Sequence, residues 1–371
     1  MRHLLLAILP AAVIAAAAPK YTLKPDSSVF IDDPFALRAD GKAVAWIATD
    51  GASLATLHLS DLGGSDIRID QAPTSATAVR WLSPARALVV WREPESQALY
   101  AQAFTASGAD KERLGPAELI DLTTLDGKPA VVTYARIDTG RTVEHRFAAF
   151  RPDTLKPLAK KTIKEDKEGM VAHPGGAFHP LWVEHDLTTL MVKREGQYDK
   201  SRDMKRPDRL AQVDVFSGKL HDEQEIADLI AFVHVNAAHG HHPGEDRFAY
   251  VSDDHAKLLI IDGASERAIT LPHPLSLYDP DSLRYQPLDG GKLALSFTVD
   301  PMNPKALARQ HADPAALDLY VVDGTTVTPR FHLDIGDRPA SWQLLGNQLV
   351  VLRKSKGYDR GGVALEVYDL P

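Results

Sequence analysis

Short apolar stretches separated by polar turns recur along the whole chain. In the clearest example, residues 243–254 (PGEDRFAYVSDD) lead from a turn into an apolar stretch, which is followed by residues 257–262 (KLLIID) and 268–271 (AITL). Brief apolar runs bounded by Gly, Pro and Asp are typical of β-strands joined by tight turns. The pattern therefore predicts an antiparallel meander.

Six further units repeat this arrangement, at residues 39–60, 79–104, 118–150, 178–216, 284–322 and 341–368. Seven units over residues 18–371 give about 51 residues each, close to the length of a four-stranded propeller blade. A single meander leaves one face and two edges uncovered, so each blade has to pack against its neighbours in a closed ring. The sequence predicts an all-β protein, a β-propeller with seven four-stranded blades.

The two ends of the chain are expected to close the ring. The last unit contains three clear strands, and residues 21–24 (YTLK) offer a fourth that would lie next to residues 363–368 (VALEVY). A shared blade of this kind makes residues 18–371 a single β-propeller domain. The alternative is that residues 21–24 form a frayed N-terminal arm.

Residues 1–17 have the pattern of a secretory signal peptide. A basic start (MRH) precedes an apolar run over residues 4–16, and three alanines end at Ala17. The run is shorter than the ~20 residues of a membrane-spanning helix and contains Pro10, which favours cleavage near Ala17 over an uncleaved anchor. The prediction is a periplasmic or secreted protein. No later stretch is apolar and long enough to predict a transmembrane span.

The amino-acid composition limits the kinds of partner that the protein is expected to bind. The chain has no cysteine, which excludes disulfides and a lipid-anchored cysteine, so the protein is not expected to be a lipoprotein. Its formal net charge of −8 argues against nucleic acid as a partner. The expected partner is an envelope protein or a periplasmic ligand.

Three segments interrupt the strand pattern. Residues 221–230 (HDEQEIADLI) have an acidic start and helical spacing, which predicts a short helix. Residues 301–316 contain three prolines and predict a loop or short helix. The insertion at residues 196–209 carries five basic residues that could hold an acidic partner: Lys200, Arg202, Lys205, Arg206 and Arg209. Because three aspartates alternate with them, a solvated loop is the alternative.

The turn-and-strand repeat resembles a known family. Residues 243–254, 39–46 and, more loosely, 79–91 are similar to the Pro-Asp-Gly-Lys-x-Ile-Ala-Tyr-x-Ser-Asp repeat of TolB-like propellers and of the propeller domain in prolyl-oligopeptidase-type enzymes. Gly244-Glu245 replaces the usual Asp-Gly. The resemblance implies a β-propeller without the α/β-hydrolase domain that the peptidases add.

Histidines supply the candidate chemistry. His239 and His241 would lie on the same side of an extended strand, and His179 in the preceding unit could converge with them on an axial channel. Imidazole and carboxylate groups bind divalent metals, so a zinc or calcium ion is the possible cofactor. Further candidate ligands are His242, His255 and Asp253. The alternative is a solvated turn without any metal.

Three functions follow from these features. The first is an exported propeller that acts as a protein- or ligand-binding scaffold in the cell envelope. The second is a metal-dependent hydrolase, similar to propeller lactonases, with a histidine-lined channel. The third is a stand-alone propeller accessory to a peptidase. No catalytic signature is recognised in the sequence, so no catalytic residues are assigned.

Five tryptophans recur at similar places in the units and are expected to pack between blades: Trp46, Trp81, Trp91, Trp182 and Trp342.

Overall fold

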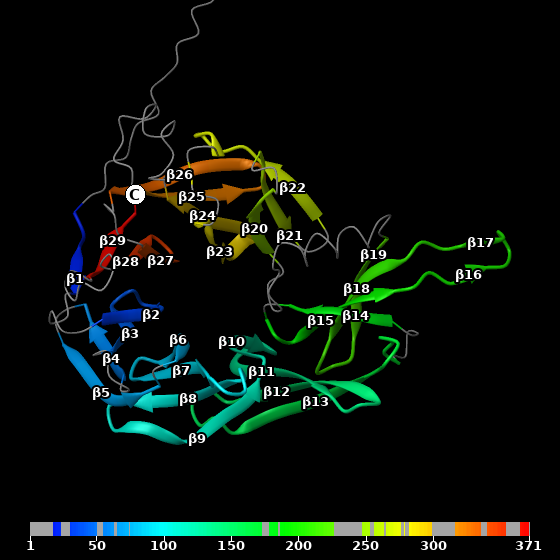
Figure 1. Cartoon of the computed structure of the whole chain (residues 1–371), viewed down its shortest axis with the longest axis horizontal. Coiled ribbons are helices and arrows are strands. Elements are labelled where there is room, and N and C mark those ends of the chain that lie inside the picture. Colours follow the sequence, from blue (N-terminus) through cyan, green and yellow to red (C-terminus); the bar gives the residue numbers. More distant parts are fainter. Residues whose placement is uncertain are drawn as a thin grey trace, which may run out of the picture.

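The protein is built almost entirely of β-strands that form seven sheets around a central axis (Figure 1). This computed structural model describes residues 18–23, 30–49, 55–62, 65–73, 75–172, 178–184, 186–225, 247–252, 256–262, 265–275, 278, 282–298, 316–334, 340–353 and 364–370. Each sheet is an antiparallel meander, as the alternation of apolar stretches and turns predicts. The seven sheets are the seven blades of a β-propeller.

The first four blades each have four strands. Blade 1 consists of β2 (Phe30–Leu37), β3 (Ala43–Thr49), β4 (Ala55–Asp61) and β5 (Asp66–Ala72). Blade 2 consists of β6 (Ala76–Ser83), β7 (Arg86–Arg92), β8 (Leu99–Thr105) and β9 (Gly108–Ala117). Blade 3 consists of β10 (Leu119–Leu125), β11 (Lys128–Asp138), β12 (Thr142–Phe150) and β13 (Pro157–Asp166). Blade 4 consists of β14 (Phe178–Val183), β15 (Thr189–Arg194), β18 (Arg209–Asp214) and β19 (Leu220–Glu225).

The last three blades complete the ring. The described residues of blade 5 form β20 (Arg247–Val251), β21 (Leu258–Asp262) and β22 (Ser265–Ile269). Blade 6 consists of β23 (Arg284–Leu288), β24 (Lys292–Thr298), β25 (Ala316–Asp323) and β26 (Thr326–Asp334), with the short 3-10 helix η3 (Asp289–Gly291) between its first two strands. Blade 7 consists of β27 (Ala340–Leu345), β28 (Gln348–Arg353), β29 (Ala364–Asp369) and β1 (Tyr21–Leu23).

Blade 7 combines strands from both ends of the chain. β1 pairs antiparallel with β29, in a register that places Tyr21 opposite Val367 and Leu23 opposite Leu365. The amide of Lys20 donates to the carbonyl of Val367 at 2.7 Å, which extends the pairing by one residue. The predicted closure by shared terminal strands is therefore confirmed, and it gives the outer edge of β29 a hydrogen-bonded partner.

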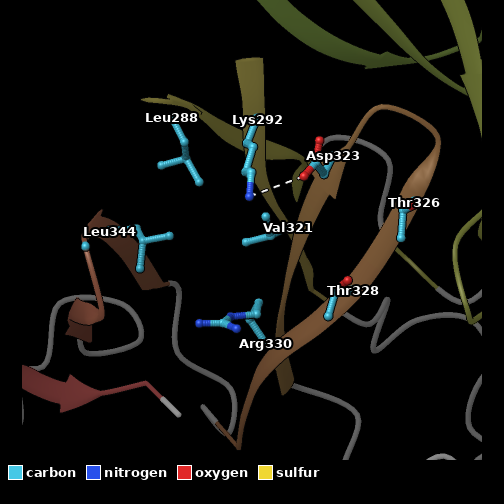
Figure 2. A pocket seen from close by; sticks show the side chains of 9 residues that line it. Leu288, Lys292, Val321, Asp323, Thr326, Thr328, Arg330 and Leu344 are labelled. Atoms are coloured by element: carbon cyan, nitrogen blue, oxygen red, sulfur yellow. Dashed lines mark ion pairs between the residues drawn. The ribbon is translucent and has the colours of Figure 1, made fainter. Parts of the chain in front are cut away.

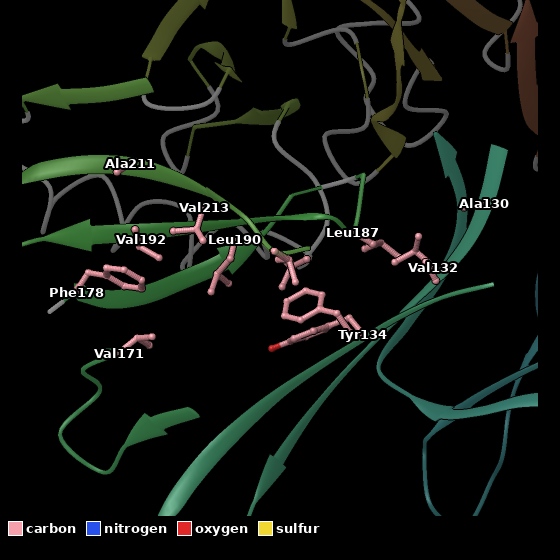
Figure 3. Packing of buried hydrophobic residues seen from close by; sticks show 14 residues of the cluster. Ala130, Val132, Tyr134, Val171, Phe178, Leu187, Leu190, Val192, Ala211 and Val213 are labelled. Atoms are coloured by element: carbon pink, nitrogen blue, oxygen red, sulfur yellow. The ribbon is translucent and has the colours of Figure 1, made fainter. Parts of the chain in front are cut away.

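Apolar side chains fill the seams between neighbouring blades. The described residues contain six apolar clusters, and each joins two adjacent blades. Between blades 3 and 4, Val132 and Tyr134 of β11 lie opposite Leu187 and Leu190 of blade 4 (Figure 3). Burying one large apolar side chain contributes about 2 kcal/mol, so each seam adds several such increments. Packing between blades, together with strand closure, holds the ring without disulfides.

Tryptophans hydrogen-bond across two of these seams. The Trp81 indole N–H of blade 2 donates to the carbonyl of Ala36 in blade 1 at 2.9 Å. The Trp342 N–H of blade 7 donates to the Ser296 hydroxyl of blade 6 at 2.5 Å. Trp46 is buried in the cluster that joins blades 7 and 1. For these three residues, the prediction that tryptophans pack between blades is confirmed.

The predicted helix at residues 221–230 is wrong in its first half. Residues 221–225 belong to β19, which pairs with β18 and completes blade 4; residues 226–230 lie outside the described residues. The backbone of this segment satisfies its hydrogen bonds on the open edge of β18, and that tertiary pairing outweighs the helical spacing. In the part of the chain that the structure describes, no helix has the length and apolar character needed to cross a membrane.

Candidate functional site

The basic insertion of blade 4 forms a β-hairpin that projects away from the ring (Figure 1). Its strands are β16 (Tyr198–Asp199) and β17 (Met204–Lys205), placed between β15 and β18. Tyr198 pairs with Lys205 and Asp199 pairs with Met204. The sequence predicts an insertion carrying basic residues at this place, and the structure shows that it is an ordered hairpin.

The base of the hairpin is held by Asp208. One oxygen of its carboxylate accepts a hydrogen bond from the Gly196 amide at 2.9 Å and lies 3.4 Å from the Lys205 ammonium. This amide, with Lys205 and Lys193 nearby, holds the pKa of Asp208 below its ordinary value of 3.8. A Cβ atom on Gly196 would overlap the carbonyl oxygen of Arg206, so the close approach of the two chains requires glycine here.

The tip of the hairpin is held by its own polar groups. The Asp199 carboxylate accepts from the Ser201 hydroxyl at 2.6 Å and from the Arg206 guanidinium at 3.0 Å, and these bonds lower its pKa. The Tyr198 hydroxyl donates to Asp203. These contacts lie within the hairpin itself, so the projecting segment has a defined shape without support from the ring.

Large apolar side chains are exposed on this hairpin. Tyr198 is 57% exposed and Met204 is 52% exposed, although both are residue types that fold into cores. Residues 193–209 also carry seven lysines and arginines against four carboxylates, in a protein whose net charge is −8. The hairpin therefore combines exposed apolar surface with local positive charge, a combination found at sites that bind other proteins.

The five predicted basic residues divide into three groups. Among the described residues, no carboxylate lies within ion-pairing distance of Lys200 or Arg202, which leaves both charges available at the turn. Lys205 and Arg206 form ion pairs with Asp208 and Asp199 inside the hairpin. Arg209 is the first residue of β18, at the base. Their predicted role in partner binding stays a prediction, and the structure shows which charges are already paired.

The predicted metal ligands are placed only in part. His239, His241, His242, His255 and Asp253 lie outside the described residues. His179 lies in β14, opposite Lys193 of β15, and its Nε2 is 3.2 Å from the Glu195 carboxylate. Within the described ranges no group of three or more metal-ligating side chains is found. The metal site stays a prediction.

A buried polar chain in blade 3 is absent from the sequence-based predictions. The Tyr134 hydroxyl lies 3.0 Å from His145 Nδ1, and His145 Nε2 lies 2.6 Å from Glu165 Oε2. With His145 neutral, the tyrosine donates to Nδ1 while Nε2–H donates to the carboxylate, so every group is satisfied. Burial is the main cause of the raised pKa of Tyr134. A signal existed, because Val143, His145 and Phe147 alternate on one face of a strand, which places the histidine in the core.

The arrangement of strands defines the class of this protein as a seven-bladed β-propeller with a projecting hairpin on its fourth blade. No family model and no curated protein matches the sequence. Solved structures with similar folds include the β-propeller domain of the Trilobed protease from Pyrococcus furiosus, at 12% identity over 92% of this chain and 84% of that chain, with a TM-score of 0.34.

Two other solved structures show the same kind of similarity. The polysaccharide lyase Uly1 is 9% identical over 98% of this chain and 94% of that chain, with a TM-score of 0.44. The acylaminoacyl peptidase of Pyrococcus horikoshii is 12% identical over 94% of this chain, with a TM-score of 0.43, and this chain spans only 54% of that enzyme. The neighbours include propeller domains of peptidases, and they differ from one another in function.

Proposed function

We propose that this protein is an exported β-propeller that binds an acidic protein partner in the cell envelope through the β16–β17 hairpin. The observation that carries the proposal is the exposure of Tyr198 and Met204 on a hairpin that is stiffened by its own polar contacts. A preformed binding element loses little conformational entropy when it docks, so more of the contact energy appears as affinity.

The charges of the hairpin support an acidic partner. Lys200 and Arg202 lie in the turn between β16 and β17 and have no ion pair among the described residues. Unpaired cations around an apolar centre attract a negatively charged surface toward it. They also supply the polar rim that surrounds the apolar centre of a protein interface. The signal-peptide pattern of residues 1–17 supports export, which would place the hairpin in contact with envelope proteins.

The experiment compares three variants in partner capture from envelope extract. The first carries Tyr198→Ser and Met204→Ser, the second carries Lys200→Glu and Arg202→Glu, and the matched control carries Leu158→Ser. Leu158 lies on the outer strand of blade 3 and is 51% exposed, nearly as much as Met204.

Proteins bound to immobilised variants are identified and their affinities are measured after purification. Truncating a central interface side chain typically costs 1–2 kcal/mol, so each hairpin variant is expected to bind the partner about 10-fold more weakly or worse. The control should bind as the unmodified protein does, and binding of the unmodified protein should weaken as salt is added. A set of bound proteins that is the same for all variants would refute the proposal.

A further inference from the structure

A pocket of about 440 Å³ lies in the seam between blades 6 and 7. It lies at the turns after β23, β25 and β27, beside the apolar cluster that joins these blades. Leu288, Val321 and Leu344 line its inner wall (Figure 2). Leu344 is buried, and the other two are half-buried. The volume falls within the range of small-molecule sites, and the wall is apolar.

Charged side chains stand at the edge of this apolar wall. Lys292 Nζ is 3.2 Å from the Asp323 carboxylate, so these two charges largely cancel. Arg330 of β26 extends into the same space below Val321 (Figure 2). Among the described residues, no carboxylate lies within ion-pairing distance of its guanidinium. The lining therefore carries one uncompensated positive charge beside an apolar surface.

The hydroxyls of Thr326 and Thr328 line the same pocket, so hydrogen-bond donors accompany the guanidinium. A planar guanidinium matches the two oxygens of a carboxylate, and hydroxyls can complete its coordination. Because Arg330 is the single uncompensated charge of the lining, it balances a monoanion but leaves part of the charge of phosphate or another dianion without a partner. Each feature selects the same chemical class.

We infer that the pocket between blades 6 and 7 binds a small monocarboxylate that carries an aliphatic group. The carboxylate pairs with Arg330 and the Thr328 hydroxyl, while the aliphatic group covers Leu288, Val321 and Leu344. Two kinds of molecule present this chemistry. One is a free fatty acid, and the other is a short acylated amino acid or peptide C-terminus. The site is separate from the projecting hairpin, which belongs to blade 4, so it does not depend on the hairpin's role.

The test is calorimetric titration of the full chain with four probes: octanoate, N-acetylleucine, octanamide and inorganic phosphate. Saturable binding of octanoate or N-acetylleucine is expected, and the tighter of the two identifies the source of the carboxylate. Octanamide and phosphate should bind at least 10-fold more weakly, because one lacks the charge and the other lacks the apolar group.

Substitutions in the pocket show whether the carboxylate binds there. Arg330→Gln should weaken carboxylate binding about 10-fold or more, while Arg330→Lys should weaken it less because the charge remains. Val321→Thr, which keeps the side-chain shape, should weaken it a few-fold. Arg141→Gln, on an exposed turn of blade 3, is the control and should leave it unchanged. The inference is overturned if neither carboxylate binds, if octanamide or phosphate binds equally well, or if Arg330→Gln has no effect.

Discussion

The buried Tyr134–His145–Glu165 chain offers a quantitative test of how blade 3 is held together. The three residues are 4%, 3% and 9% exposed, and each belongs to a different strand of the blade. The substitution His145→Leu roughly keeps the side-chain volume but removes the partner of both the carboxylate and the hydroxyl. Breaking a buried charged hydrogen bond by removing one partner costs about 3–5 kcal/mol. We expect the free energy of unfolding to fall by that amount.

A double-mutant cycle separates pairing from packing. With His145→Leu and Glu165→Leu combined, no buried carboxylate is left without a partner, so the double variant should cost about 2 kcal/mol less than the sum of the single variants. Tyr134→Phe, which removes one neutral hydrogen bond, should cost about 1 kcal/mol. The exposed Arg141→Gln serves as the control and should leave the unfolding midpoint unchanged.

The assay is urea unfolding followed by tryptophan fluorescence and by far-UV circular dichroism, with the slope of the transition checked for constancy. A cost below about 1 kcal/mol for His145→Leu would refute the reasoning, since an unpaired buried carboxylate cannot be that cheap. Additive effects in the double variant would also refute it, because they would mean that His145 and Glu165 do not stabilise one another.

Three further predictions concern closure, the hairpin and the leader. Deleting residues 18–23 removes β1 and should lower the free energy of unfolding by about 2–3 kcal/mol in the same urea assay, whereas Lys20→Gln, which removes only an exposed ion pair, should not. The Asp208 carboxylate, whose pKa is lowered, stabilises the hairpin above the ordinary carboxyl pKa of 3.8, and this stabilisation is lost as pH falls below that value. The protection of the amides of residues 197–206 from hydrogen exchange, taken relative to their intrinsic exchange rates at each pH, should therefore stay constant from about pH 5 to 8 and fall below about pH 4. A loss of protection near neutral pH would contradict this. Protein recovered from the envelope should begin at Ala18, and mass spectrometry that finds residues 1–17 still attached would show an uncleaved leader.

The fold could be predicted because its information is local. Each meander repeats the same alternation of apolar stretch and turn, and closure follows because the last unit contains only three clear strands and residues 21–23 supply its fourth. The pattern at residues 221–225 misleads because helical spacing and an acidic start are weak preferences beside an open strand edge.

The candidate sites depend on distant residues and were predicted less well. The positive charge of the hairpin is visible in the sequence, but which cations are already paired depends on the register of Tyr198 with Lys205. The pocket needs Arg330 of blade 6 and Leu344 of blade 7, which approach only through the packing of two blades. No motif or spacing in the sequence indicates that these two residues come together. The buried His145 was detectable from strand alternation, but its partner Glu165 sits among exposed lysines and has no comparable mark.

The most direct test of partner docking through the hairpin is site-specific photo-crosslinking in intact cells. A photoreactive phenylalanine analogue replaces Tyr198 in one variant, Met204 in a second and Leu158 in a third, and the three positions have similar exposure, at 57%, 52% and 51%. Discrete light-dependent adducts of the same mass are expected from positions 198 and 204, with none of that mass from position 158. Adducts from position 158 alone, or none from the hairpin, would contradict docking through this element.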